Sequence, residues 1–162
     1  MNQAPLTLNR ADIARRIPHQ GAMCLLDHVT AWDEHAITCE ASSHQALDNP
    51  LRAQGRLGAA CGVEYAAQAM AVHGALLAEQ AAGPGQAPRA GYLASLRSVT
   101  LHVDQLDTVT GTLRVAAERM TGDGNTVLYS FTVTSGDTCL LSGRAAVVLD
   151  AAALFSPTGG AA

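Results

Sequence analysis

A carboxylate and an amide lie one helical turn apart in an otherwise apolar segment. Glu64 and Gln68 fall within residues 57–82, LGAACGVEYAAQAMAVHGALLAEQAA, which is rich in alanine and contains no proline. Burial of an unpaired carboxylate is unfavourable unless the group is paired or protonated, and a protonated carboxyl group is a candidate general acid. The Gln68 amide could orient that carboxyl group. The alternative is that Glu64 faces water near the positive end of the helix dipole.

His19 is the candidate base. It follows Pro18 in IPHQGAMCLLDHV, residues 17–29, just before the apolar run Met23 to Leu26. Imidazole changes protonation near neutral pH, which suits general base catalysis. A structural role for a histidine beside a proline is the alternative, and the sequence leaves it open.

Two further features bear on chemistry. The start of the apolar segment, around Gly58 and Ala59, offers backbone N–H groups that can polarise a carbonyl oxygen as charge develops on it. The remaining histidines are dispersed, and the four cysteines form no C-x-x-C pair; they are Cys24, Cys39, Cys61 and Cys139. We therefore predict reduced thiols and no metal site.

Composition excludes several classes of function. The chain has 162 residues and a formal net charge of −4, which does not indicate a nucleic-acid-binding surface. It contains no lysine, so Schiff-base chemistry and a G-K-[ST] phosphate loop are excluded. No apolar run approaches the length of a membrane-spanning helix and no signal peptide is evident, so we expect a cytoplasmic protein. One domain over residues 1–150 and a loose tail over 151–162 are predicted.

Hydrophobic periodicity predicts a long helix and several strands. Helices are expected at residues 10–17 and 57–82, and strands at about 23–33, 36–43, 92–103, 109–118, 127–133 and 139–149. The alternation changes phase within 92–103, which predicts a bulge near Arg97. Two strands, one buried helix and a four-strand antiparallel meander predict an α+β hot-dog fold, with the sheet wrapped around the central helix. An unpaired sheet edge predicts at least a dimer.

Three stretches resemble the hot-dog 3-hydroxyacyl-[acyl carrier protein] dehydratases. IPHQGAMCLLDHV is similar to that family's P-H-x-x-x-x-L-L-x-D segment, GVEYAAQAM to its helix motif with a carboxylate followed by A-Q, and YLASLRSVTLHV to its strand after the helix. Their order and spacing agree over about residues 12–149. The usual H-F-P histidine is absent, because Pro50 stands in its place. Likeness to a divergent branch from aryl polyene clusters is stronger, through PHQGAM, NPLRAQGRL and GVEYAAQAMAVHGAL.

The resemblance implies removal of water from a 3-hydroxyacyl thioester on acyl carrier protein, without a cofactor. It implies His19 as the base and Glu64 as the acid, two groups that in hot-dog dimers commonly come from different subunits. Substrate contacts are expected from Asn49, Gln68 and the N–H groups of Gly58 and Ala59. Carrier docking is expected at four arginines, Arg52, Arg56, Arg89 and Arg97.

The sequence leaves open both the oligomeric state and the reaction. The chain pairs with itself or with another hot-dog protein, and no nucleic acid or membrane span is expected. A thioesterase, in which Glu64 activates water or attacks the thioester, is a second interpretation of the same residues. A non-catalytic subunit that shapes a partner's tunnel is a third, because Pro50 replaces the usual histidine.

Overall fold

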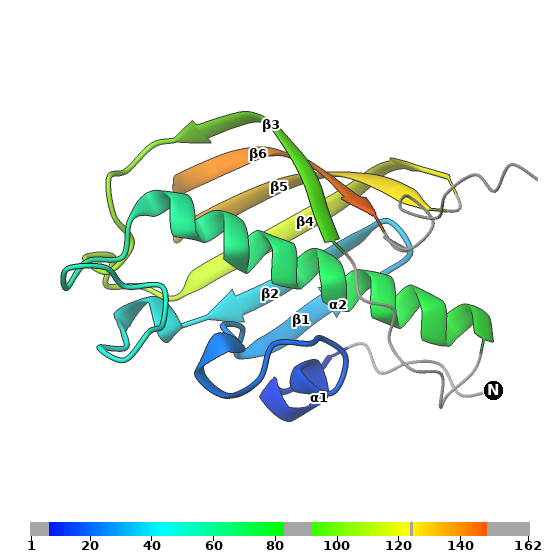
Figure 1. The fold of residues 1–162 in the computed structure, drawn as a ribbon, viewed down its shortest axis with the longest axis horizontal. Helices are drawn as coiled ribbons and strands as arrows, with labels where there is room; N and C mark the ends of the chain where they lie inside the picture. The colour runs from blue at the N-terminus through cyan, green and yellow to red at the C-terminus, as the bar shows by residue number, and fades with distance from the viewer. Residues whose placement is uncertain (1–6, 83–91, 124, 149–162) are drawn as a thin grey trace, which may run out of the picture.

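The computed structural model describes residues 7–82, 92–123 and 125–148 (Figure 1). The first half contains α1 (Arg10–Ala14), β1 (His28–Trp32) and β2 (Ala36–Ala41), with short 3-10 turns at Gly21–Met23 and Ser43–Gln45. A third 3-10 turn, Ala59–Cys61, leads into the long helix α2 (Gly62–Ala82). Four longer strands follow: β3 (Tyr92–Leu101), β4 (Leu113–Gly122), β5 (Thr126–Ser135) and β6 (Thr138–Val148).

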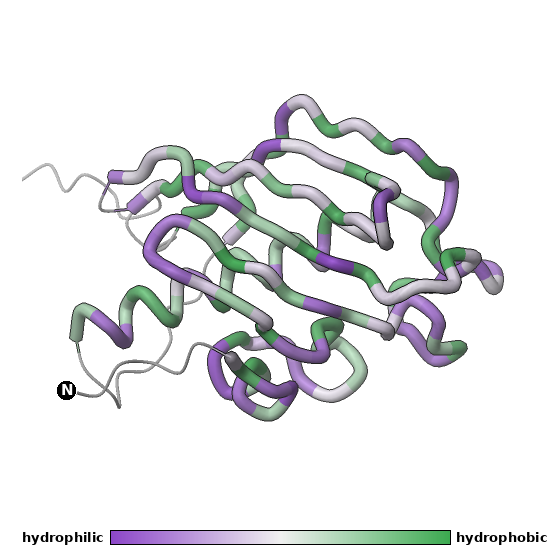
Figure 2. The backbone as a smooth tube through the Cα atoms, turned by 180° about the vertical axis from the view of Figure 1, so that it is seen from behind, coloured by the Kyte–Doolittle hydropathy of each residue, from purple (hydrophilic) through white to green (hydrophobic). Residues whose placement is uncertain are grey.

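The strands form one six-stranded sheet in the order β1-β2-β4-β5-β6-β3, and every neighbouring pair is antiparallel. Helix α2 lies across one face of this sheet (Figure 1). Buried and exposed residues alternate along β4 and β5, so one face of these strands packs inward and the other faces outward; the hydropathy colours change along the strands accordingly (Figure 2). This is the hot-dog fold that the sequence predicts.

The predicted four-strand meander is wrong in one respect. β4, β5 and β6 form a meander, but β3 pairs with β6 at the far edge and not with β4. The connection from β3 to β4 is bound at the start of α2, where the Leu106 N–H donates to the Leu57 carbonyl oxygen at 2.8 Å. This contact directs the chain past β6 and β5 to the opposite side of the meander.

Close packing of α2 on the sheet depends on a small residue. A Cβ atom on Gly62 would lie 2.5 Å from a methyl carbon of Leu141, which is fully buried on β6. A larger residue at position 62 would require the buried Leu141 side chain to shift. Among the described residues, no helix is long and apolar enough to cross a membrane.

The first predicted strand begins later than expected. Residues 24–26 are buried consecutively, whereas β1 starts at His28, because three adjacent side chains cannot all face one side of a strand. The first helix also ends earlier than predicted, at Ala14. The predicted bulge is confirmed by a register shift between Arg97 and Thr100, with Ser98 at φ +54°.

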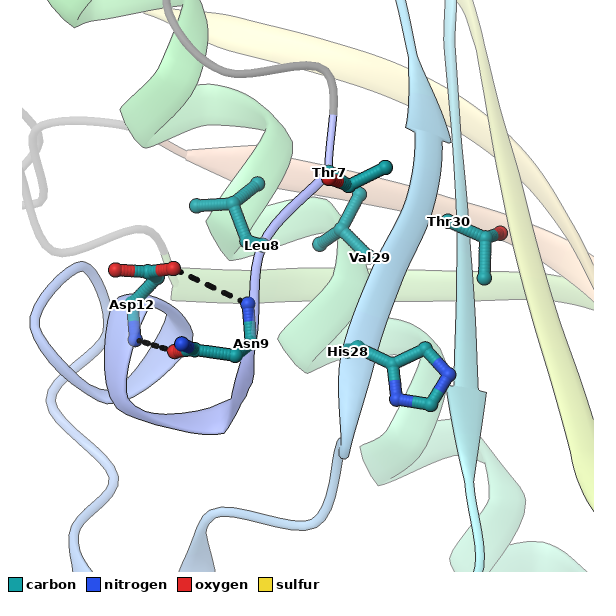
Figure 3. A pocket seen from close by; sticks show the side chains of 7 residues that line it. All are labelled: Thr7, Leu8, Asn9, Asp12, His28, Val29 and Thr30. Carbon is teal, nitrogen blue, oxygen red and sulfur yellow. Dashed lines mark hydrogen bonds between the residues drawn. The ribbon is translucent and has the colours of Figure 1, made fainter.

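The two edges of the sheet differ. At the β1 edge, the N-terminal segment occupies the strand: Leu8 and Val29 exchange two backbone hydrogen bonds, of 3.1 and 2.9 Å. Figure 3 shows this segment beside β1, with Asn9 and Asp12 capping α1 reciprocally. At the other edge, β3 has no neighbour beyond β6 among the described strands.

A buried histidine joins α2 to the sheet. His73 is fully buried; its Nε2–H donates to the Asp33 carbonyl oxygen, and its Nδ1 accepts from the Tyr129 hydroxyl, both at 2.7 Å. Burial lowers the pKa of His73 below its ordinary value of 6.5. His73 is thus a core histidine with both ring nitrogens paired.

We predict that His73 makes stability pH-dependent. The folded-state pKa lies below the unfolded value of 6.5, so the unfolded chain binds more protons and the free energy of unfolding falls as pH drops below 6.5. The slope reaches about 1.4 kcal/mol per pH unit for one group. Urea unfolding between about pH 7.5 and pH 5 should show a shallower slope for His73→Gln, while His35→Gln, at an exposed site, keeps the wild-type slope. Equal slopes for wild type and His73→Gln would contradict this assignment.

Candidate active site

His19 and Glu64 meet within one chain. His19 lies in the loop between α1 and the turn at Gly21–Met23, and Glu64 lies in the first turn of α2. The His19 Nε2 and Glu64 Oε1 atoms are 3.1 Å apart, with 27% and 35% of the two side chains exposed. The structure thus brings the two groups together without a second subunit. Glu64 is neither deeply buried nor directed freely into water.

Hydrogen bonding indicates the resting tautomer of His19. Its Nδ1 atom is buried and has no hydrogen-bond partner in the described part of the chain. A buried N–H without an acceptor is rarer than a buried acceptor without a donor. The favoured arrangement therefore places the hydrogen on Nε2, donated to Glu64 Oε1. The Nδ1 lone pair then faces the interior.

Gln68 fixes the loop that follows His19. Its side chain is fully buried; Oε1 accepts the Leu25 N–H at 2.9 Å, and Nε2 donates to the Met23 carbonyl oxygen at 2.8 Å. The sequence suggests that this amide orients Glu64, but both of its hydrogen bonds go to the backbone instead. Gln68 thus ties the loop to α2 one turn after Glu64, and so brings His19 to the carboxylate.

Tyr65 supports the same loop from its other side. The Tyr65 hydroxyl donates to Ser43 Oγ at 2.8 Å, and Ser43 Oγ donates to the Leu25 carbonyl oxygen at 2.7 Å. Asn49 Nδ2 donates to the Tyr65 hydroxyl and to the Ser43 carbonyl oxygen, while its Oδ1 accepts the Leu51 N–H. Burial raises the pKa of Tyr65. Asn49, expected to contact substrate, has its donors and acceptor engaged in this network.

Sequence reasoning missed Tyr65 and Ser43. The available signal was a large polar ring in a helix turn otherwise built from small residues, because a buried tyrosine hydroxyl usually requires a partner. Nothing in the spacing indicated that Ser43 is that partner.

Only part of the expected backbone donor pair is free. The Ala59 N–H donates to the Asp104 carbonyl oxygen at 3.0 Å and is therefore unavailable to a thioester. Gly58 is paired with Gln105 in an isolated bridge, and its N–H has no hydrogen-bond partner within the described residues. Gly58 therefore remains the candidate donor of the two.

The four expected docking arginines have different surroundings. Arg52 is 12% exposed and donates to the carbonyl oxygens of three loop residues, His44, Ala46 and Gly55, with Asp107 3.9 Å away. It holds its own loop together and is not presented for docking. Arg56 and Arg97 are exposed, and Arg56 Nε donates to Gln105 at 2.6 Å. Arg89 lies outside the described residues.

A separate pocket of about 550 Å³ beside β1 does not contain this site. It is lined by Thr7, Leu8, Asn9, Asp12, His28, Val29 and Thr30 (Figure 3). Its histidine pairs with Glu40 at 2.8 Å, and its Asn9 and Asp12 cap α1. These polar groups are engaged in holding the fold.

We predict that Gln68→Leu destabilises the protein and releases the loop. The substitution leaves the Leu25 N–H and the Met23 carbonyl oxygen without partners, which should lower the free energy of unfolding by about 2–4 kcal/mol. Amide hydrogen exchange should accelerate around residues 19–27. Gln45→Leu is the control. Gln45, like Gln68, makes two hydrogen bonds to the backbone, but its side chain is exposed, so this substitution should lower the free energy of unfolding by about 1 kcal/mol or less. Unchanged exchange in the loop would rule out the assigned role.

Comparisons with known proteins agree with this fold. A structure titled as the dehydratase heterocomplex ApeI:P from Xenorhabdus doucetiae superposes with a TM-score of 0.74 at 22% identity, over 85% of this chain and 90% of that chain. An uncharacterised protein from Pyrococcus horikoshii has a TM-score of 0.56 at 14% identity, over 85% and 92% of the two chains. A hypothetical thioesterase with coenzyme A from Streptococcus pneumoniae has a TM-score of 0.54 at 10% identity, over 75% and 84%.

A search of curated protein sequences gave no match. The model of the ApeP-like family, described as ApeP dehydratase, matches residues 11–155. That match spans most of the sequence, and the chain therefore belongs to the ApeP-like dehydratase family.

Proposed function

We propose that the protein dehydrates a 3-hydroxyacyl thioester on acyl carrier protein to the trans-2-enoyl thioester, in fatty acid or aryl polyene biosynthesis. The single observation that carries this proposal is the 3.1 Å contact between His19 and Glu64. The dehydratase family and the similar solved heterocomplex support the reaction class. A base and an acid side by side suit elimination across adjacent carbons.

In the proposed mechanism, His19 removes the proton at C2 and Glu64 protonates the hydroxyl leaving C3. The electrons of the C2–H bond form the double bond, the C3–O bond breaks, and water departs. The thioester oxygen carries the developing charge and is held by the Gly58 N–H. The active state of the pair holds one proton on neutral His19 and one on the Glu64 carboxyl group.

Direct contact between His19 and Glu64 gives a way to restore their protonation states after each turnover. After elimination, His19 has gained a proton and Glu64 has lost one. A separation of 3.1 Å allows the proton to return from imidazolium to carboxylate without a relay through solvent. The next substrate then meets the pair in its active state.

We predict that Glu64→Gln and His19→Gln each lower kcat by about 10² to 10⁴. Glu64→Gln keeps a polar side chain beside His19 but cannot deliver a proton. The double variant should be little worse than either single variant, because the two groups act as a unit. Intact-mass measurement of a 3-hydroxyacyl carrier-protein substrate reports the loss of water, and His28→Gln, at another histidine paired with a glutamate, is the control.

Three outcomes would count against this assignment. Near-wild-type dehydration by both single variants would remove His19 and Glu64 from the chemistry. Release of free acid in place of water would favour a thioesterase. Activity that depends only on a partner's residues would make this chain a non-catalytic subunit.

We also propose that the working assembly pairs the free edge of β3 with a second hot-dog subunit. Three leucines of β3 face the α2 side yet are at least 40% exposed: Leu93, Leu96 and Leu101. A partner strand would cover them and satisfy the unpaired backbone of β3. The similar Xenorhabdus structure is itself a heterocomplex.

For carrier docking, Arg56 is the candidate best supported by its exposure and by its place beside Gly58. We predict that Arg56→Glu raises KM for the acidic carrier-bound substrate several-fold with little change in kcat. Raising the salt concentration should bring the KM values of wild type and variant closer together. Arg114→Glu on β4 carries the same charge change at another exposed position and serves as the control. Equal KM values for wild type and Arg56→Glu would exclude Arg56 from docking.

A further inference from the structure

Two arginines lie opposite each other next to the free edge of the sheet. Arg97 of β3 pairs in register with Arg144 of β6. Both are exposed, and Arg144 precedes Ala145, which is buried on the α2 side. Successive residues of a strand face opposite sides, so both guanidinium groups lie on the face away from α2.

Within residues 7–82, 92–123 and 125–148, no carboxylate neutralises this pair. Neither arginine forms an ion pair with any described residue. Along the same cross-strand row, Arg144 faces Ser130, which faces Glu118. Two strand spacings separate Glu118 from Arg144, about 10 Å. Like charges directly opposite on neighbouring strands destabilise a sheet.

The space between the arginines is open to an incoming group. A pocket of about 190 Å³ is lined by Ser95, Arg97, Met120, Leu128, Tyr129, Arg144, Ala145 and Ala146. Met120 and Leu128 are each more than 40% exposed. A carboxylate on a strand paired with β3 would lie one strand spacing from Arg97, about 5 Å.

Self-pairing at this edge would worsen the repulsion. Arg97 is the sixth of the ten residues of β3 and so lies near the middle of the strand. Antiparallel pairing of β3 with its own copy about a central two-fold axis places Arg97 opposite, or diagonal to, the same residue of that copy. Four guanidinium groups then line one row, because Arg144 of each copy continues it.

We infer that this edge selects a different hot-dog chain, one that presents a carboxylate beside Arg97, and disfavours a second copy of this chain. The inference rests on the proposed pairing at β3 and deepens it by naming the charge the partner must carry. Attraction to an acidic strand and repulsion of an identical one act together, as in other interfaces that discriminate between partners. Arg97, expected from the sequence to dock the carrier, acts instead at the subunit interface.

The test mixes two forms of the chain in equal amounts. The double variant Arg97→Glu/Arg144→Glu supplies the acidic row that the partner is inferred to carry. Native mass spectrometry at low salt should show mixed dimers above the half share that random pairing gives. Each homodimer should be weakened about tenfold or more relative to the mixed dimer, since like-charge contacts at an interface are strongly unfavourable. Salt at about 0.5 M should bring the distribution back towards random.

Two controls keep the result interpretable. Arg114→Glu, on the same face but away from the free edge, should pair randomly with wild type. If the acidic double variant does not fold, the neutral form Arg97→Gln/Arg144→Gln should self-associate more tightly than wild type at low salt. Random pairing of the acidic variant, or wild-type self-association that neither salt nor the neutral form changes, would overturn the inference. Because assembly is measured without substrate, a failure here is distinct from a failure of the dehydration test.

Discussion

The buried amide of Gln68 is the interaction on which the candidate site depends. It bonds the backbone of the loop between α1 and β1, at Met23 and Leu25, and this bonding holds the loop against the second turn of α2. Glu64 lies one turn earlier on the same helix, so a loop held at Gln68 brings His19 to the carboxylate. The hydroxyl of Tyr65, acting through Ser43, bonds the same loop at Leu25. Two polar side chains of α2 thus fix the position of a loop in which residues 19–27 belong to no strand of the sheet.

Local patterns predicted much of the fold. Val127, Tyr129, Phe131 and Val133 alternate with polar residues and are all buried on β5, and the change of phase near Arg97 marks a real bulge. Long-range pairing was not predictable in the same way. Nothing in the residues of β3 states that its neighbour is β6, because that choice depends on where the connection to β4 is bound, at Leu57 and Ala59. The apolar run that includes residues 24–26 predicted a strand. An apolar run does not reveal which side chains share a face, and in the structure these residues are buried without forming one.

The sequence identified residues of the candidate site better than it identified their roles. His19 and Glu64 were singled out as base and acid, and the structure places them in contact. Asn49 was expected from the resemblance to contact substrate, and Arg52 was expected to help dock an acidic carrier protein. Their actual partners are backbone atoms, one tyrosine hydroxyl and, for Arg52, the nearby Asp107 carboxylate. Burial distinguishes a polar residue that meets a ligand from one that holds its own loop together. A short sequence motif does not reveal that burial.

The two hydrogen bonds between Leu8 and Val29 have a consequence for how large an assembly can grow. A sheet with two open edges can add subunits at both ends and so polymerise. Here the chain occupies part of its own β1 edge, and the reciprocal cap at Asn9 and Asp12 holds the following helix beside it. Growth through the strand pairing that we propose at β3 would therefore be one-sided: a single partner on β3 would end the sheet as a closed pair and not as a fibre.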